Sequence, residues 1–327
     1  MTRFLVTGGA GFVGSHLCEK LLEEGHTVYS IDNLSTGSMK NIVNLVEKYP
    51  QTFKHFTKDI EENEELLSEL IDLSDVVFHL AAAVGVKIVV EEPTRTLITN
   101  SLCTELVLKH AAKKNKRVII TSTSEVYGKE GINSVLKEDG DLLVGSSDKS
   151  RWSYAISKLF DEHLALAYHK EKGLPVTIVR LFNTVGPKQT GEYGMVVPRF
   201  IKAALNNEQI QVYGDGKQSR CFCYVKDVID ALINLVKEEK SIGGIYNIGS
   251  SHEISINDLA QKIKEQLKSG SEVVLVPYEK AYKPGFEDMK KRVPDTSKIK
   301  DLIGWQATTD LSEIIKKTAE YLNSSKD

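Results

Sequence analysis

Tyr154 and Lys158 are the side chains in this sequence best suited to move a proton. They lie near the start of a helical pattern that begins at Arg151, and residues four apart on a helix share one face. A phenol is a poor base at its usual pKa of about 10, but a nearby ammonium stabilises the phenolate. The spacing therefore predicts a pair that takes a proton from a substrate hydroxyl.

A second reactive group follows the strand-like run Arg117 to Thr121, where the sequence continues as Ser-Thr-Ser-Glu-Val-Tyr-Gly over residues 122–128. Open α/β sheets bind ligands outside the carboxyl ends of their strands. We therefore expect Thr123, Ser124 and Glu125 to join Tyr154 and Lys158 in the catalytic centre.

A glycine-rich turn near the start of the chain predicts a dinucleotide site. Gly8, Gly11 and Gly14 stand between a buried strand and a helical pattern, where they allow a tight turn, close approach to a pyrophosphate and close helix packing. Asp32 ends the next strand 18 residues after Gly14, near the spacing expected for an acid that binds the adenosine ribose. No arginine adjoins Asp32 to take a 2′-phosphate, which favours NAD over NADP. A hydride would then pass from the hydroxyl-bearing carbon to nicotinamide.

The remaining expected cofactor contacts surround these motifs. Asp59 either bonds the adenine amino group or caps the acidic helix predicted after it. His79 lies in a buried strand and is expected to be a core residue without a chemical role. The other predicted contacts are Phe12, Val13, Asn33, Ile60, Leu80, Ala81, Ala82, Asn100, Phe182 and Val185.

The elements that must position these residues alternate between strand and helix from residue 3 to residue 121. This alternation predicts an α/β fold with a Rossmann-type, doubly wound parallel sheet. We expect residues 1–182 to form the NAD-binding domain, to which residues 225–250 return. Residues 183–224 and 251–327 are expected to form a smaller α+β substrate-binding lobe.

Composition excludes several other classes of function. The 327 residues carry a net charge of −3, which gives no basic surface for nucleic acid or membrane. No apolar run approaches the ~20 residues of a membrane span, and a core strand begins within three residues of Met1. We expect a cytoplasmic protein. Cys221 and Cys223 lack further metal ligands nearby, so no metal site is expected.

Taken together, these motifs resemble the extended short-chain dehydrogenases/reductases, within the group of nucleotide-sugar epimerases, dehydratases and decarboxylases. The resemblance covers essentially the whole chain. It implies an NAD that is held tightly and not consumed, and a homodimer formed through two helices of the NAD-binding domain. The motifs that carry it are the three glycines, Asp32, residues 59–60, 79–82 and 122–128, Tyr154-x-x-x-Lys158, and Arg180-Leu181-Phe182-Asn183.

The resemblance also implies a UDP-sugar substrate. Arg220 matches the arginine that binds the diphosphate in this group, a role that suits its planar fork, although a surface pair with Asp215 is the alternative. Arg292 matches a second substrate arginine. The full set of implied substrate contacts is Val84, Thr123, Ser124, Glu125, Tyr154, Asn183, Val197, Arg199, Val212, Tyr213, Arg220 and Arg292.

The choice of reaction is less specific, because all members of the group first form a 4-keto sugar. Residues 186–200 look most like UDP-sugar 4-epimerases, so we predict a 4-epimerase acting on UDP-glucuronate or a related UDP-hexose. Glu125 departs from the galactose-type epimerases, and the residues around Glu125, Arg151 and Arg292 resemble UDP-glucuronate decarboxylases, which are the alternative. A 4,6-dehydratase, a non-catalytic NAD-binding regulator and a reductase that consumes NADP are further alternatives.

Overall fold

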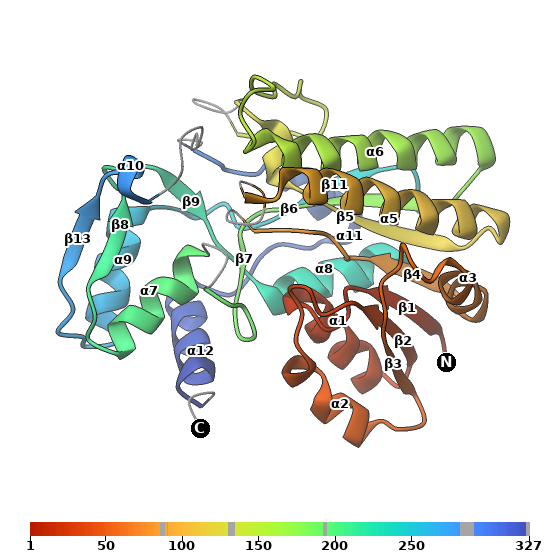
Figure 1. The fold of residues 1–327 in the computed structure, drawn as a ribbon, viewed down its shortest axis with the longest axis horizontal. Coiled ribbons are helices and arrows are strands. Elements are labelled where there is room, and N and C mark those ends of the chain that lie inside the picture. The colour runs from red at the N-terminus through yellow and green to blue at the C-terminus, as the bar shows by residue number, and fades with distance from the viewer. Residues whose placement is uncertain (86–88, 90, 130–134, 192–194, 282–290, 325–327) are drawn as a thin grey trace.

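Seven parallel strands form the central sheet of the chain, which we describe from a computed structural model (Figure 1). The structure describes residues 1–85, 89, 91–129, 135–191, 195–281 and 291–324. The strand order is β11-β6-β5-β4-β1-β2-β3, which confirms the predicted Rossmann-type α/β fold. These strands are β1 (Arg3–Thr7), β2 (Thr27–Asp32), β3 (Phe53–Thr57), β4 (Val76–His79), β5 (Arg117–Thr123), β6 (Val176–Leu181) and β11 (Ile245–Ile248).

The chain direction across this sheet creates a cleft at its carboxyl edge. From β1 the chain moves outward to β2 and β3, and then crosses back to place β4 on the other side of β1. Connections that leave in opposite directions open a crevice at the strand ends between them, where such sheets bind ligands. The glycine turn after β1 and residues 80–84 after β4 lie at this point.

Helices cover both faces of the sheet because its strands are apolar on both sides. Phe4 and Val6 of β1 belong to one hydrophobic cluster and Leu5 to another, as expected when successive side chains point to opposite faces. Figure 1 shows α5 and α6 above the sheet and α1 and α8 below it. The helices of this half are α1 (Phe12–Glu23), α2 (Val43–Lys48), α3 (Glu64–Leu73), α5 (Pro93–Lys113), α6 (Trp152–Lys172) and α8 (Val225–Lys237), with short 3-10 turns η1 (Met39–Asn41), η2 (Ser124–Tyr127) and η3 (Glu239–Ser241).

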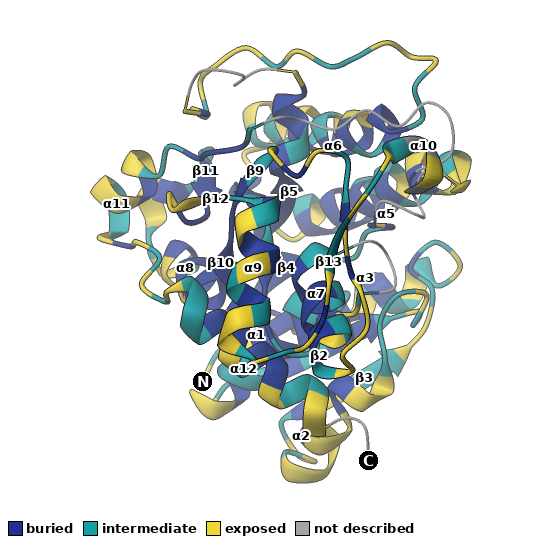
Figure 2. Cartoon of the chain, turned by 90° about the vertical axis from the view of Figure 1, so that its left-hand side faces the viewer, coloured by how far each residue is buried: buried dark blue, intermediate teal, exposed yellow. Residues whose placement is uncertain are grey.

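A smaller group of elements stands beside the carboxyl edge of the sheet (Figure 1). Its strands pair two by two: β8 (Ile210–Tyr213) with β13 (Val273–Val276), β9 (Ser219–Cys221) with β12 (Glu253–Ser255), and β7 (Thr184–Val185) with β10 (Cys223–Tyr224). Its helices are α7 (Val196–Leu205), α9 (Ile256–Gln266), α10 (Tyr278–Ala281) and α12 (Leu311–Ser324), while α11 (Ser297–Ile303) packs beside β11. Figure 2 shows α9 with one buried and one exposed side, and Leu259 and Ile263 lie on the buried side.

Neither a membrane-spanning helix nor a metal-binding cluster occurs in the part of the chain that the structure describes. None of the described helices is both long and apolar enough to cross a bilayer. Among the same residues, the side chains of His, Cys, Asp and Glu form no group of three or more that could hold a metal ion.

Candidate active site

A cavity of about 560 Å³ lies between the carboxyl edge of the sheet and the smaller lobe. This volume is in the range of small-molecule and cofactor sites. Most of the predicted site residues line it: Gly8, Gly11, Phe12, Val13, Gly14, Asp32, Asn33, Asp59, Ile60, Leu80, Ala81, Ala82, Val84, Thr123, Ser124, Glu125, Tyr154, Lys158, Asn183, Val185, Val197, Arg199, Tyr213, Arg220 and Arg292.

Three predicted contacts, Asn100, Phe182 and Val212, lie behind the cavity wall. The Asn100 side chain accepts a hydrogen bond from the Ala83 amide at 2.7 Å and donates to the Ser157 hydroxyl at 3.0 Å, so it holds the wall in place. Phe182 and Val212 are fully buried in hydrophobic clusters. Phe182 and Val212 lie in extended segments, where adjacent side chains point to opposite sides. Their neighbours therefore face the cavity, while these two side chains point away from it.

The glycine turn forms one end of the cavity and leaves no room for side chains. A Cβ on Gly14 would lie 2.1 Å from the Gly8 carbonyl oxygen, and Gly8 has a φ of +71°. Helix α1 begins after its N-cap Gly11 without a side-chain cap, and Gly11, Phe12, Val13 and Gly14 all line the cavity. The start of a helix offers unpaired N–H groups and a positive dipole end, which suit a diphosphate.

Two acids at this end hold the loops around them. Asp32 accepts hydrogen bonds from the amides of Ala10 at 3.0 Å and Leu34 at 2.8 Å. Asp59 accepts from the Asn33 amide group at 2.8 Å and from the Glu61 amide at 2.9 Å. Helix α3 begins only at Glu64, so Asp59 does not cap it. Of the two predictions for Asp59, the helix cap is therefore wrong.

His79 is a core residue, as predicted. Its ring nitrogens contact the hydroxyls of Thr7 at 2.8 Å and Thr104 at 3.1 Å, and the residue is fully buried. Burial disfavours the charged ring and lowers the pKa of His79 to about 3. A neutral ring with both nitrogens bonded supports β4, and His79 is not among the residues that line the cavity.

Glu125, in the turn η2 after β5, is held between two arginines. Arg151 contacts one carboxylate oxygen at 3.0 Å, and Arg292 contacts the other at 2.6 Å. Burial alone would raise the pKa of Glu125, but the charges of Arg151 and Arg292 outweigh it and lower the pKa to about 2. Glu125 is therefore ionised, and it holds two guanidinium groups at the cavity wall.

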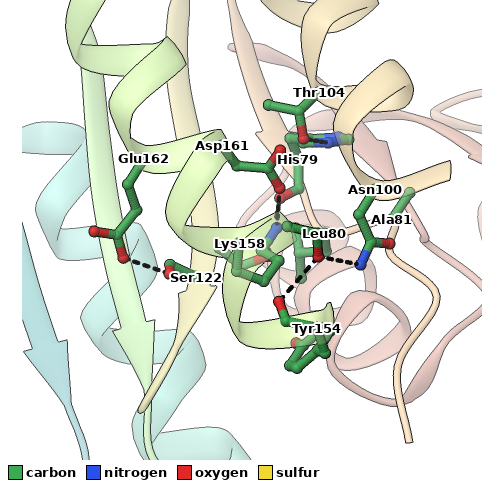
Figure 3. Close-up of polar contacts among 12 residues, drawn as sticks. His79, Leu80, Ala81, Asn100, Thr104, Ser122, Tyr154, Lys158, Asp161 and Glu162 are labelled. Carbon is green, nitrogen blue, oxygen red and sulfur yellow. Dashed lines mark hydrogen bonds and ion pairs between the residues drawn. The ribbon is translucent and has the colours of Figure 1, made fainter. Parts of the chain in front are cut away.

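Tyr154 and Lys158 both lie on the cavity wall. Burial, and then the charge of Glu125, raise the pKa of Tyr154, while a hydrogen bond with Thr123 acts in the opposite direction. The Lys158 ammonium is paired with Asp161 at 2.8 Å (Figure 3). The stabilisation of a Tyr154 phenolate by Lys158 stays a prediction.

The hydroxyls at the end of β5 and the start of η2 have separate tasks. Thr123 accepts a hydrogen bond from the Glu125 amide at 3.2 Å and so caps η2. Ser122 donates to the carboxylate of Glu162, which lies behind the strand (Figure 3). Ser124 is buried and lines the cavity beside Thr123. Thr123 is therefore the hydroxyl placed to contact both Tyr154 and a ligand.

The smaller lobe contributes cations and an aromatic ring. The guanidinium of Arg199 lies 4.0 Å from the centre of the Tyr213 ring, and both residues line the cavity. Arg220 is only 8% exposed and also lines the cavity, whereas Asp215 is exposed and accepts a hydrogen bond from the Lys217 amide. Arg220 is therefore a cavity residue rather than a surface residue.

From the sequence we predict no contact for two residues near the reactive groups, Arg151 and Asp161. The partner of Arg151, Glu125, is 26 positions earlier, so no local spacing indicates this ion pair. Asp161 follows Lys158 by three positions, a spacing at which helical side chains meet, so its sequence position did contain a usable signal.

A family model described as GDP-mannose 4,6 dehydratase matches residues 5–318. The chain belongs to this family. The match confirms the resemblance to the extended short-chain dehydrogenases/reductases and places the chain in the superfamily of nucleotide-sugar epimerases, decarboxylases and dehydratases.

Members of this superfamily with different reactions are similar to the chain. A UDP-N-acetyl-alpha-D-glucosaminuronate decarboxylase from Bacillus cytotoxicus is 44% identical, over 98% of this chain and 97% of that protein. UDP-glucuronic acid decarboxylase 1 from Xenopus tropicalis is 34% identical, over 98% and 72% respectively. A solved UDP-glucuronic acid 4-epimerase from Bacillus cereus, in complex with UDP-glucuronic acid and NAD, is 30% identical with a TM-score of 0.87, and covers 99% of both chains.

Proposed function

We propose that this chain is an NAD-dependent decarboxylase of UDP-hexuronates, with UDP-N-acetylglucosaminuronate as its substrate. The observation that carries the proposal is the group formed by Glu125, Arg151 and Arg292, which brings two guanidinium groups to the cavity wall beside Tyr154. The decarboxylase similar over nearly the whole of both chains supports the same reaction. We thus prefer decarboxylation to epimerisation, whereas the sequence patterns alone favoured epimerisation.

The first half of the cavity fits NAD. Its uncapped helix start suits the diphosphate, its glycine turn leaves backbone in direct reach of a ligand, and Asp32 lines the position expected for the ribose. Bound NAD would accept a hydride from C4 of the sugar and later return it. In this proposal residues 1–182 and 225–250 bind NAD, and residues 183–224 and 251–327 bind the nucleotide sugar.

The chain itself supplies the proton chemistry at C4. Tyr154 lines the cavity and takes the proton of the C4 hydroxyl, while Thr123 holds that oxygen through its own hydroxyl. Lys158 lies one helical turn further along α6, with its ammonium at the cavity wall. The resulting 4-keto sugar with a C6 carboxylate is a β-keto acid, in which the C5–C6 bond breaks, CO2 leaves and C5 takes a proton.

The arginines select the substrate that can react in this way. A hexuronate brings a carboxylate next to the reactive carbon, and a carboxylate is stable there only if cations face it. Arg151 and Arg292 provide these charges, and Glu125 fixes their positions by ion pairs with both. Arg199 and Arg220 are placed to bind the UDP end of the same substrate.

A 4-epimerase remains the second candidate, because the solved epimerase from Bacillus cereus matches the whole fold and is complexed with UDP-glucuronic acid. Both reactions begin with the same 4-keto sugar. Epimerisation requires the keto sugar to turn over in the cavity and to keep its carboxylate.

Product analysis distinguishes these reactions. The purified protein is incubated separately with UDP-N-acetylglucosaminuronate and UDP-glucuronate, and the products are identified by mass spectrometry and NMR. We expect a UDP-pentose derivative that is lighter by one CO2, formed faster from the acetamido sugar. A product of unchanged mass with an inverted C4 would establish the epimerase instead, and a 4-keto-6-deoxy product would establish a dehydratase.

An apolar surface on α5 and α6 supports one further proposal, that two copies of the chain form a homodimer. Leu97, Ile98 and Leu102 of α5 and Ile156 and Phe160 of α6 are all at least 37% exposed, and the two helices pack side by side. We call these five residues the α5–α6 face. Contiguous exposed apolar side chains of this kind mark protein interfaces, and two copies of the face would cover each other.

A further inference from the structure

A buried ion pair lies directly behind the reactive tyrosine. The Asp161 carboxylate and the Lys158 ammonium are 2.8 Å apart, and their side chains are 0% and 2% exposed. Tyr154, Lys158 and Asp161 follow one another at spacings of four and three, so they lie along one face of α6. Lys158 lines the cavity, whereas Asp161 lies deeper, towards β4 (Figure 3).

The other ionisable groups around this pair are neutral or held by their own partners. His79 of β4 is kept neutral by burial, and its ring nitrogens contact Thr7 and Thr104. Burial also raises the pKa of the Cys103 thiol on α5, which therefore stays protonated. Glu162 binds the Arg180 guanidinium at 2.7 Å, and Glu125, on the far side of Tyr154, is held by its two arginines. Asp161 is thus the carboxylate that serves Lys158.

We propose that Asp161 is a positioning residue that holds the Lys158 ammonium at the cavity wall and places a fixed negative charge behind Tyr154. An ammonium has three donors. One of them binds Asp161, and Lys158 itself lines the cavity. A buried ammonium without a carboxylate is costly, so this pair allows a charged lysine to stay beneath the reaction centre.

The same carboxylate also opposes the ionisation of Tyr154. Burial contributes most to the raised pKa of Tyr154, the charge of Glu125 comes next, and Asp161 adds in the same direction. Asparagine has the shape of aspartate and can still accept a hydrogen bond from Lys158, but it carries no charge. In Asp161→Asn, Tyr154 is therefore expected to ionise at a lower pH than in the unmodified chain.

Tyrosinate absorbance measures this ionisation directly in the protein as purified. Tyr154→Phe, titrated alone and in the Asp161→Asn background, provides the blanks that isolate the signal of Tyr154. We expect Asp161→Asn to lower the midpoint by roughly one pH unit, and Asp161→Glu, which keeps the charge, to restore the parent value. Glu162→Gln is the matched control, because it removes the neighbouring buried carboxylate on α6 and is expected to lower Tm without moving the midpoint.

An unchanged midpoint in Asp161→Asn, or an equal shift in Glu162→Gln, would overturn the proposal. Should Asp161→Asn fail to fold, Lys158→Met gives a second test, because it leaves Asp161 buried without its cation. The double variant Lys158→Met/Asp161→Asn is then expected to melt above Lys158→Met, and a lower Tm would show that Asp161 stabilises the fold independently of Lys158. The inference rests on the proposed role of Tyr154 as the base, but neither test needs turnover, so a failed decarboxylase assay would leave both tests interpretable.

Discussion

At the scale of single residues, Glu125 shows how the cavity maintains a charge away from bulk water. Its carboxylate is 21% exposed, and the loss of water alone would favour the neutral acid. Attraction to Arg151 and Arg292 reverses this balance and lowers the pKa of Glu125 to about 2, although burial acts in the opposite direction. Glu125 is therefore ionised at every pH at which the protein would be assayed, and both arginines keep a fixed anionic partner.

Replacement of Tyr154 by phenylalanine removes the proposed base while keeping the aromatic ring. We expect turnover to fall by about 100- to 10,000-fold, the contribution typical of general base catalysis. The initial rate of product formation measures this effect. Tm and the fraction of protein with bound NAD should stay close to the parent values. Turnover near the parent rate would remove Tyr154 from the mechanism.

Replacement of Arg292 by glutamine tests the recognition of the C6 carboxylate. Loss of a charge-assisted hydrogen bond costs about 1.5–3 kcal/mol, or roughly 10- to 100-fold in affinity. We expect calorimetry to show this loss for a UDP-hexuronate and a much smaller change for the corresponding UDP-hexose, which lacks the carboxylate. Arg95→Gln is the control, since Arg95 lies at the cavity wall and pairs with Glu92 rather than Glu125. Equal losses for both ligands would argue against this role.

At the scale of elements, the turn between β1 and α1 is determined by close backbone contacts. The side chain of any residue other than glycine at position 14 would overlap the Gly8 carbonyl group, which lies on the same turn. The start of α1 would then have to move away from the sheet, and the expected diphosphate site with it.

Gly14→Ala is therefore expected to lower Tm and to abolish the retention of NAD through purification. The absorbance and mass of the nucleotide released on denaturation measure retention. Gly270→Ala is a suitable control, because a Cβ there would meet its nearest neighbour at 3.4 Å, an ordinary contact distance. A Gly14→Ala protein that keeps its dinucleotide would contradict the proposed cofactor site.

Asn247 connects the segments that carry the two charged ends of the proposed carboxylate site. This fully buried residue of β11 accepts a hydrogen bond from Tyr127, two positions after Glu125. It donates to the carbonyl groups of Leu136 and Asp295, and the latter lies three positions after Arg292. The separation of Glu125 and Arg292 thus depends on an amide outside the cavity.

Much of this arrangement was predictable from local patterns, and the remainder depends on contacts distant in sequence. The Gly8 to Gly14 turn, Asp32 and the pair Tyr154 and Lys158 follow from spacing within single strand–helix units. The partner of Lys158 is three positions away on the same helix and could also have been predicted from spacing. The partners of Glu125 could not, because Arg151 and Arg292 are distant in sequence and meet it only in the fold. The inward or outward direction of Val212 likewise depends on the register of β8 against β13.

At the scale of the whole molecule, the α5–α6 face predicts a dimer. We expect sedimentation to give the mass of two chains for the parent protein and of one chain for Phe160→Glu, because a buried carboxylate opposite its own copy is unfavourable. Val46→Glu is the control, because Val46 is an exposed apolar residue of α2, which is not part of the face. A parent protein that sediments as a single chain would show that the face has another role.

Release of labelled CO2 shows whether the sugar loses its carboxylate during turnover. Purified protein is given UDP-N-acetylglucosaminuronate that carries an isotopic label at C6, with no NAD added beyond what the protein retains. We expect one labelled CO2 for each UDP-sugar consumed, over many turnovers and without net formation of NADH. Full retention of the label in a C4-inverted product would rule out decarboxylation.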